Sequence, residues 1–413
     1  MSTHSPNVSQ TANPRMLRLQ GVVQHYSWGG YDFIPALIGQ SNPDRQPFAE
    51  LWIGSHPKAP SRAWIDGAEV PLDRVPGGRV PYLLKVLDAR QMLSIQAHPN
   101  RAQAEAGFAR ENAAHIPLDD PRRNYRDANH KPEVHVALTE FWMLHGFRPL
   151  EDIARVLRQT PELGRALPTF QRDAAELPQL ETERREWLRA LYRAVMTMPQ
   201  SAVDTILNPL IARLERTGRL DKDTPDYWAL RAARDFPMPN GHRDRGILSI
   251  YLLNLVRLRP GEGTYQPAGT LHAYLEGVNV ELMANSDNVL RGGLTSKHVD
   301  AQELLRTLSF DSGAPVVLAG RPVSDTEAVY RTAAQEFELS RIEVRPGQEC
   351  RAGAVHGPDT LLVMEGAGSA ECNGETLRLQ RGDILFVPTG LAYSLRADGE
   401  RWVVFRASVP ARG

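Results

Sequence analysis

Long apolar runs, abundant cysteine and an excess of either charge are all missing from this 413-residue sequence. The two cysteines, Cys350 and Cys372, exclude a disulfide framework and a cysteine-rich zinc site, and they fit a reducing compartment. Lys plus Arg number 48 and Asp plus Glu number 49, so no overall field favours nucleic acid or anionic lipid. Any recognition of an anion must therefore be local.

Membrane and export segments are not indicated either. The most apolar stretch, residues 247–256, is too short for a membrane span. The polar start lacks the basic-then-apolar order of a secretory signal, and residues 1–16 are predicted to be a disordered tail. We therefore expect a cytoplasmic protein with no membrane and no nucleic-acid partner. Hydrophobic residues make up 42% of the chain and charged residues 23%, which is typical of a globular protein.

Two kinds of pattern divide the rest of the chain. From residue 17 to about 150, short apolar runs such as 82–87 and 134–138 alternate with turn residues, which predicts an antiparallel sandwich or barrel. One helix, at about residues 100–112, is expected to interrupt it. Between residues 151 and 240 the pattern becomes helical, and the strand pattern resumes after that.

The clearest helical stripe has apolar residues at i, i+3, i+4, i+7, i+8 and i+11, namely Val203, Ile206, Leu207, Leu210, Ile211 and Leu214. Ser201 is the expected N-cap of this helix, and Gly218 is expected just beyond its end. Pro209 is expected to kink or divide it. This region is predicted to be a helical subdomain.

An internal repeat lies in the C-terminal half. A Gly-acid pair, four residues and a Pro-x-Gly string occur at 261–269 and again at 382–390, each after an alternating strand. The string resembles the second motif of a cupin-type β-barrel. We therefore predict a mainly β protein with a helical insert (α+β), made of two cupin-type barrel or sandwich units and a helical subdomain. The predicted catalytic unit comprises residues 17–150 and 241–320, the helical subdomain 151–240, and a unit without metal ligands 321–413.

Four side chains could supply the ligands of one divalent ion. Gln96 and His98 are two residues apart, so they share a face of an extended strand. Glu133 follows a proline, and His272 lies where cupin barrels commonly place a ligand. Each of these segments alone is also compatible with a polar strand end, a solvated loop or a hydrogen-bonded interior histidine. Together they offer O, N, O and N donors that suit zinc.

A second group of side chains suits an anion. Asp287, Arg291 and Lys297 cluster with Thr295 and Ser296 around two glycines, and cations with hydroxyls in such a loop favour phosphate. An isolated Arg and Asp would equally fit a surface turn with an ion pair.

Long stretches of the chain resemble the type I phosphomannose isomerases (mannose-6-phosphate isomerases). The resemblance rests on QHYSWGG (24–30), PFAELWIGSHPKAPS (47–61), PYLLKVLDARQMLSIQAHPN (81–100), NHKPEVHVALTEFWMLHGFRP (129–149) and GTLHAYLEGVNVELMANSDNVLRGGLTSKHVD (269–300). It implies one Zn²⁺ per chain held by Gln96, His98, Glu133 and His272. It also implies isomerisation of mannose 6-phosphate to fructose 6-phosphate, in mannose metabolism on the route to GDP-mannose.

The resemblance further implies roles for individual residues. The expected catalytic groups are Arg291, Lys131, His130 and Asp287. The side chains expected to contact the sugar phosphate are Ser94, Lys85, Lys297, Glu281, Tyr274 and Trp28. Strand alternation from Glu133 places His130 on the opposite face from Lys131 unless the chain turns, which argues against a ring-opening role for it.

The expected chemistry is proton transfer between C1 and C2 through an enediolate, with Lys131 as first candidate for the shuttle and Arg291 facing the developing oxyanion. A bound metal would lower the cost of the enediolate. Two alternatives stay open: a cupin-type metal-dependent dioxygenase and a non-catalytic sugar-binding protein. A monomer or weak homodimer is expected.

Overall fold

The computed structural model describes residues 14–411, and its strands form three antiparallel sheets. Most of the tail predicted over residues 1–16 lies outside the described residues, while Met16 is buried at the start of the folded part. The largest sheet consists of β2 (Val22–Gln24), β3 (Glu50–Gly54), β6 (Tyr82–Ala89), β7 (Ile95–Ala97), β8 (Glu133–Ala137), β9 (Phe141–Phe147), β10 (Leu253–Leu258), β11 (Glu262–Gln266), β12 (His272–Ala284), β13 (Leu290–Gly293) and β14 (Leu318–Ala319).

The second and third sheets belong mainly to the C-terminal part. The second sheet contains β1 (Leu17–Gln20), β4 (Arg62–Ile65), β5 (Ala68–Pro71), β15 (Arg321–Pro322), β16 (Glu327–Tyr330), β17 (Glu338–Val344), β19 (Asp359–Glu365), β22 (Ile384–Val387) and β24 (Trp402–Ser408). The third contains β18 (Glu349–Ala352), β20 (Ala367–Cys372), β21 (Glu375–Gln380) and β23 (Tyr393–Ala397). β1 pairs with both β22 and β4, so three early strands complete the sheet built on the C-terminal segment.

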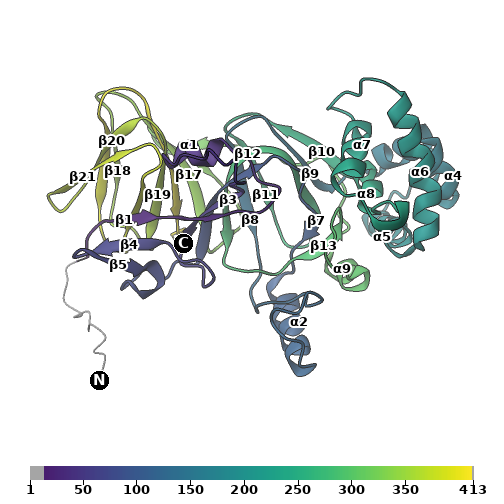
Figure 1. Cartoon of the computed structure of the whole chain (residues 1–413), viewed down its shortest axis with the longest axis horizontal. Coiled ribbons are helices and arrows are strands. Elements are labelled where there is room, and N and C mark those ends of the chain that lie inside the picture. Colours follow the sequence, from purple (N-terminus) through teal and green to yellow (C-terminus); the bar gives the residue numbers. More distant parts are fainter. Residues whose placement is uncertain (1–13, 412–413) are drawn as a thin grey trace.

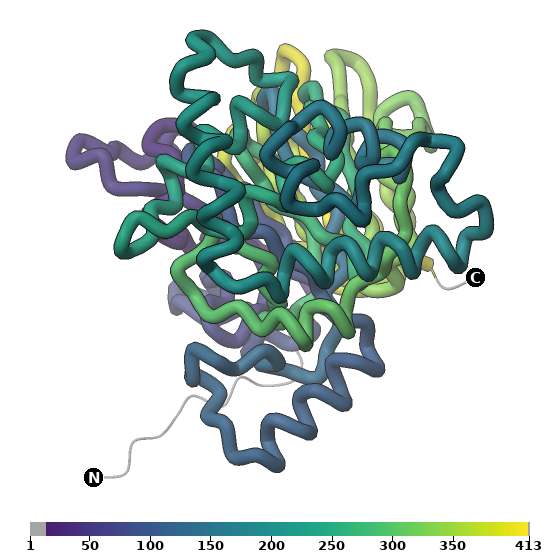
Figure 2. Tube along the Cα trace, turned by 90° about the vertical axis from the view of Figure 1, so that its right-hand side faces the viewer, coloured from purple at the N-terminus to yellow at the C-terminus, as the bar shows by residue number. Residues whose placement is uncertain are grey.

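Most helices gather at one end of the molecule, next to the largest sheet (Figure 1). The α-helices are α1 (Phe33–Leu37), α2 (Arg101–Ala113), α3 (Leu150–Gln159), α4 (Pro161–Ala166), α5 (Glu181–Thr197), α6 (Gln200–Arg216), α7 (Pro225–Asp235), α8 (Gly246–Leu252) and α9 (Ala301–Thr307). Short 3-10 helices are η1 (Leu72–Arg74), η2 (Pro168–Phe170), η3 (Ala174–Glu176) and η4 (Pro239–Gly241). Seen from the helical end, these helices cover the sheets while α2 projects below them (Figure 2).

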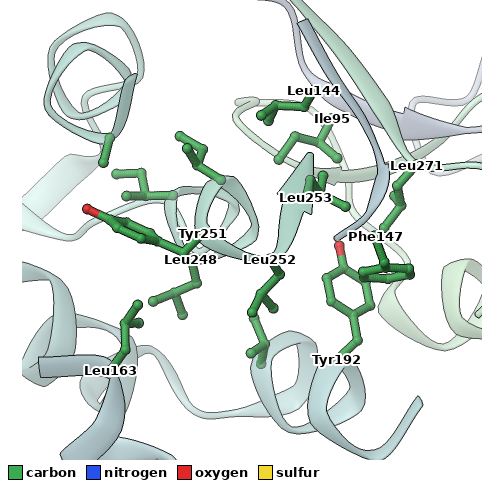
Figure 3. Packing of buried hydrophobic residues seen from close by; sticks show 14 of the residues in the cluster. Ile95, Leu144, Phe147, Leu163, Tyr192, Leu248, Tyr251, Leu252, Leu253 and Leu271 are labelled. Atoms are coloured by element: carbon green, nitrogen blue, oxygen red, sulfur yellow. The ribbon is translucent and has the colours of Figure 1, made fainter. Parts of the chain in front are cut away.

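The order of layers follows from which faces are apolar. One face of the largest sheet packs against the second sheet through residues such as Val136, Val280 and Phe405. The other side of the second sheet packs on the third sheet. The helical subdomain buries its apolar stripes against β7, β9 and β13, where Tyr192, Phe147 and Leu271 meet (Figure 3). The mainly β fold with a helical insert is therefore confirmed, whereas its domain boundaries stay predictions.

The sequence-based helix predictions were partly right. α2 begins after Asn100, whose side chain accepts the N–H of Gln103 in a capping box, so the predicted helix at 100–112 is confirmed. α6 contains the predicted stripe and is followed by Gly218 at a φ of 78°. The N-cap at Ser201 was wrong, because the helix begins at Gln200 directly after the extended Pro199. Pro209 does not divide the helix, since six buried apolar side chains hold both halves on one core.

The internal repeat is visible in the backbone. Gly261 and Gly382 have φ values of 89° and 90°, and Gly269 and Gly390 have 79° and 88°. Because L-residues with a side chain rarely adopt this region, glycine recurs at both turns of both copies. Each copy is thus a strand between two matching turns, β11 in the first and β22 in the second, and the predicted repeat is confirmed.

β12 shapes the largest sheet into a barrel. Its C-terminal half pairs with β6 and β8, and its N-terminal half pairs with β7 and β9. The change of partners falls beside Gly277, at an irregularity in the β9 register. The φ of Gly277 is 120°, and a Cβ at this position would lie 2.5 Å from the carbonyl oxygen of Glu140. β12 therefore belongs to both halves of the largest sheet. The two halves together enclose the barrel interior.

Tyr82 joins the two main sheets, and its loss is expected to weaken the fold. Its buried hydroxyl lies 2.9 Å from the carbonyl oxygen of Pro358 and 3.1 Å from that of Ala407, and its single proton is shared between these two acceptors. Tyr82→Phe leaves these acceptors without the bond and should lower the free energy of unfolding by about 1–3 kcal/mol. Urea unfolding measures this. Tyr31→Phe is the matched control, since within residues 14–411 the Tyr31 hydroxyl has no side-chain hydrogen bond, and an equal loss there would contradict the prediction.

Candidate active site

Three side chains from separate strands converge inside the barrel. His98 follows β7, Glu133 begins β8 and His272 begins β12, and one ligand atom from each lies within 4.8 Å of the others. The His98 Nε2 atom is 3.4 Å from one Glu133 oxygen, and the His272 Nε2 atom is 3.3 Å from the other. All three side chains are at most 2% exposed. Residues that are far apart in the sequence thus form one buried cluster.

Hydrogen bonds on the outer side of each imidazole fix its orientation. The Nδ1 atom of His98 lies 2.7 Å from the carbonyl oxygen of Asn288, and that of His272 lies 3.0 Å from the carbonyl oxygen of Thr270. A carbonyl oxygen can only accept, so both Nδ1 atoms carry the proton. Each Nε2 lone pair is therefore directed into the cluster, as in metal-binding histidines.

Electrostatics keep the cluster in the form that a cation needs. Burial, with the nearby Lys131 ammonium, lowers the pKa of His98 to about 4, so this imidazole is neutral. Burial alone would raise the pKa of Glu133, but the charge of Lys131, whose Nζ atom lies 3.0 Å away, outweighs burial and holds the pKa well below its usual range. A carboxylate oxygen and two imidazole nitrogens are a typical ligand set for zinc.

The donor atoms also match zinc in spacing and in their need for a partner. His98 Nε2, Glu133 Oε2 and His272 Nε2 are buried without a hydrogen-bond partner among the described residues. Ligand atoms about 2.0–2.1 Å from a tetrahedral centre lie about 3.3–3.4 Å apart, which the two N···O separations reproduce. Buried polar atoms are rarely left unsatisfied, so the cluster fits a divalent cation.

Gln96 lies on the same face as this cluster. It stands directly opposite His272 across β12 and β7, and opposite Arg291 across β7 and β13. Directly paired residues of antiparallel strands project to one side of the sheet. Gln96 also lines the cavity described next, and its role as a fourth ligand stays a prediction.

A cavity of about 1250 Å³ opens onto the cluster and brings most of the predicted residues together. Its walls come from the barrel interior, the loop after β13 and the helical subdomain. The predicted site residues that line it are Trp28, Lys85, Ser94, Gln96, Lys131, Glu133, Tyr274, Glu281, Asp287, Arg291 and Lys297. His98 and His272 lie behind Glu133 as buried members of the metal cluster.

His130 is the predicted residue that lies apart. Its Nε2 atom is 2.6 Å from Glu336 of the C-terminal segment, and it does not line the cavity. β8 begins at Glu133, three residues later, and the contact with Glu336 agrees with the expectation that His130 points away from Lys131. Its position favours a contact between segments rather than one with a substrate.

A buried network beside the metal cluster holds Lys85. Its Nζ atom donates to Glu281 at 2.9 Å, and the Tyr274 hydroxyl donates to the other Glu281 oxygen at 2.7 Å. Burial alone would lower the pKa of Lys85, but Glu281 and Glu50 raise it above its usual value. Lys85 is therefore a fixed cation of the barrel wall. His135, which sequence reasoning missed, lies 3.4 Å from the Tyr274 hydroxyl, and burial lowers its pKa to about 3.

Asp287 is held at the cavity wall by two residues that sequence reasoning did not single out. Lys58 lies 2.8 Å and His56 3.6 Å from its carboxylate oxygens. Burial would raise the pKa of Asp287, but the bond to Lys58 outweighs it and lowers the pKa. Both partners belong to the SHPK string, so the only available signal was their proximity within a matched stretch.

The wall next to Gln96 is cationic. Arg291 and Lys297 line it, and within residues 14–411 neither has a carboxylate within 4.0 Å. Burial and then the charge of Arg126 lower the pKa of Arg291, and burial followed by Arg291 and Arg126 lowers that of Lys297. Repulsion among these cations is relieved by an anion, so this wall suits a phosphate group.

The comparisons with known proteins agree with this geometry. Residues 16–150 match the family described as phosphomannose isomerase type I, catalytic domain, and residues 360–410 match an AraC-like ligand binding domain. The mannose-6-phosphate isomerase of Salmonella typhimurium is 36% identical over 389 residues, covering 90% of this chain and 94% of that protein. The chain belongs to the type I phosphomannose isomerase family.

Other relatives extend this similarity. The human mannose-6-phosphate isomerase is 31% identical, with 96% of this chain and 99% of that protein covered. A zinc-bound mannose 6-phosphate isomerase superposes with a TM-score of 0.83 at 34% identity. The Salmonella typhimurium enzyme bound to substrate (F6P) and zinc gives 0.82 at 34% identity, and each structure covers 96% of this chain and 100% of its own. The predicted family is thus confirmed over nearly the whole chain.

Removing the charge of Glu133 should empty the metal site. Glu133→Gln replaces the only carboxylate of the cluster, so zinc affinity should fall more than about 100-fold, beyond the usual effect of a residue outside the ligand set. Elemental analysis of purified protein and titration with a zinc indicator measure this. Glu281→Gln is the control, because it neutralises another buried carboxylate of the same interior. Equal zinc loss from both variants would contradict the assignment.

Proposed function

We propose that this chain interconverts mannose 6-phosphate and fructose 6-phosphate at a single zinc site. The observation that carries the proposal is the position of a buried His-Glu-His cluster at one end of a cavity whose neighbouring wall has unpaired cations. A sugar phosphate has both features that this arrangement suits, namely vicinal oxygens at C1 and C2 and a phosphate at the far end. The proposed zinc ligands are His98, Glu133, His272 and Gln96.

The phosphate is proposed to bind at the cationic wall. Lys297 and the Ser94 hydroxyl both line the cavity there, and Ser94 precedes β7, whose next residues include Gln96. Binding of the phosphate directs C1 and C2 toward the metal cluster. Trp28, which stacks on Tyr26 with ring centroids 5.8 Å apart, lines the same cavity and is proposed to limit the position of the sugar.

Ring opening requires one proton to move from the anomeric hydroxyl to the ring oxygen. We assign this transfer to Asp287, because Lys58 keeps its carboxylate ionised and fixed at the wall. Asp287 accepts the proton of the anomeric hydroxyl as the bond between C1 and the ring oxygen breaks, and it then delivers that same proton to the ring oxygen, which returns Asp287 to its ionised form. His130 has no part in this step, since its ring contacts Glu336 instead.

Isomerisation then moves a proton between C2 and C1. Lys131 is the proposed carrier, because it lines the cavity and its Nζ atom, 3.0 Å from Glu133, adjoins the metal cluster. For this step the ammonium first gives up one proton to solvent, and the resulting amine takes the proton from C2 and returns it to C1. Lys85, Glu281 and Tyr274 form the fixed wall behind it. The Arg291 guanidinium, one strand away from Gln96, stabilises the negative charge that develops on the substrate oxygen. Bound zinc supplies Lewis acidity for the same charge.

The cellular setting and the assembly are also proposals. Both cysteines are free and buried, which supports a cytoplasmic location. Within residues 14–411, no helix has the length and apolar character that a membrane span requires. A monomer or weak homodimer is proposed.

A coupled assay tests the activity and its metal dependence together. Purified protein should convert mannose 6-phosphate to fructose 6-phosphate, lose activity after removal of metal by a chelator, and recover it with zinc. The reason is that Glu133 and the two histidines leave three donor atoms without a partner when metal is removed. Oxygen consumption would indicate a dioxygenase, and binding without turnover would indicate a sugar-binding protein; either result would overturn the proposal.

Substitutions at the cationic wall should separate chemistry from binding. Arg291→Ala is expected to lower kcat by about 100-fold or more, because stabilisation of a developing oxyanion is lost. Lys297→Ala is expected chiefly to raise KM, because a contact made in both ground and transition states is lost. Steady-state kinetics with zinc analysis checks both variants. Loss of zinc from Arg291→Ala would show that its assigned role is wrong.

A further inference from the structure

The loop after β13 is folded around the carboxylate of Asp244. One carboxylate oxygen accepts the N–H of Leu294 at 2.8 Å and that of Gly246 at 2.7 Å. The other accepts the N–H of Thr295 at 3.0 Å. Asp244 is only 6% exposed. A single buried side chain therefore ties two consecutive N–H groups of the loop to the first residue of α8.

The loop has a conformation that needs such support. Leu294 has a φ of 53°, in a region that is uncommon for residues other than glycine, and its side chain is fully buried. At Gly293, with φ 120°, a Cβ would lie 2.5 Å from the Cα of Gly246. Consecutive N–H groups that point at one anion form a backbone nest. In this loop the anion in the nest is the Asp244 carboxylate.

The same loop carries the cationic wall. Arg291 precedes it in β13, and Lys297 follows Thr295, whose hydroxyl accepts the N–H of Lys297 at 3.1 Å. Arg291 is placed by the pairing of β13 with β7, whereas Lys297 is placed by the loop. Within the described residues Lys297 has no carboxylate within 4.0 Å to hold its direction, so the backbone of the loop determines where its side chain begins. With the nest already filled by Asp244, binding of the phosphate falls to the side chain.

Asp244 reaches the loop from the segment that joins the helical subdomain to α8. It follows η4 and precedes α8, and the residues before it are anchored on α6 by Asp204. Asp204 accepts the N–H of Arg243 at 2.9 Å and lies 2.6 Å from the Nδ1 atom of His242. Asp204 thus holds residues 242 and 243, and Asp244 holds the first residue of α8. Of these two carboxylates only Asp244 contacts the loop after β13.

We propose that Asp244 is a positioning residue for the phosphate group of the substrate. By filling the nest, its carboxylate holds Leu294 and Thr295 in the conformation from which Lys297 reaches the cavity. This inference rests on the proposed function, since it assigns the phosphate to Lys297 at that wall.

Binding of inorganic phosphate to zinc-loaded protein tests the proposal without turnover. Asp244→Asn keeps an acceptor for Leu294 and Gly246 but loses the one for Thr295, so calorimetry should show a phosphate Kd raised about tenfold. Asp244→Ala loses all three bonds and should raise it further. In kinetics, KM for mannose 6-phosphate should rise by a similar factor in each variant while zinc content stays unchanged.

Asp204→Asn is the matched control, because it removes a carboxylate that anchors the same segment without contacting the loop. Its phosphate Kd should stay within about twofold of wild type. The proposal is overturned by an unchanged Kd in Asp244→Asn, by loss of zinc from that variant, or by an equal rise in Asp204→Asn. Should Asp244→Ala not fold, Asp244→Asn alone decides. Wild-type protein that binds phosphate but has no turnover would instead refute the proposed function.

Discussion

The ionised carboxylate of Glu133 is the charge on which the barrel interior depends. A carboxylate this deeply buried is costly unless positive charge or donors surround it. Here Lys131 lies on one oxygen, and the two histidines present neutral lone pairs rather than protons. Within the described part of the chain, the second Glu133 oxygen and the two Nε2 atoms remain without a partner, and a bound cation would satisfy all three. The same logic extends outward, where Lys85 balances Glu281 and Lys58 balances Asp287.

The fold brings these residues together because the two halves of β12 pair with different strands. Because the strand changes partners near Gly277, His272 at one end and Glu281 near the other both face the interior. Gln96 is then placed by pairing alone, since it stands between His272 and Arg291 in adjacent strands. Gln96, Glu133, His272 and Arg291 lie in strands, and His98 and Lys131 lie within two residues of a strand end. Lys297 lies beyond the turn at Leu294, which the carboxylate of Asp244 holds in place.

Sequence reasoning reached the fold class and the metal cluster because their signals are local. Alternation and turn glycines predict strands, and the four donors lie in stretches long enough to match a family. Contacts across distant segments left no such signal. Leu17 and Leu19 alternate as a strand should, but nothing in them indicates β22 as the partner. The bonds from Asp244 to Leu294, and from His130 to Glu336, likewise join residues that no periodicity relates.

In the second copy of the repeat, protein side chains neutralise the buried carboxylate where the first copy has a metal cluster. In the first copy Gln266 of β11 is paired with Glu133, and in the second the corresponding Val387 of β22 is paired with Asp359. The residue three after the turn glycine is His272 in one and Tyr393 in the other. There the Tyr393 hydroxyl donates directly to Asp359 at 2.8 Å.

The remaining charge in the second copy is met by a side chain. Arg406 lies 3.9 Å from Asp359 and 2.8 Å from Glu327. Burial raises the pKa of Asp359 to about 6, so near neutral pH the carboxyl group is still mostly ionised and needs a positive partner. A guanidinium and a phenol therefore take the places that a cation and an imidazole fit in the first copy. Both barrels bury a carboxylate at the same point of the repeat, and the group that neutralises it decides which one can do chemistry.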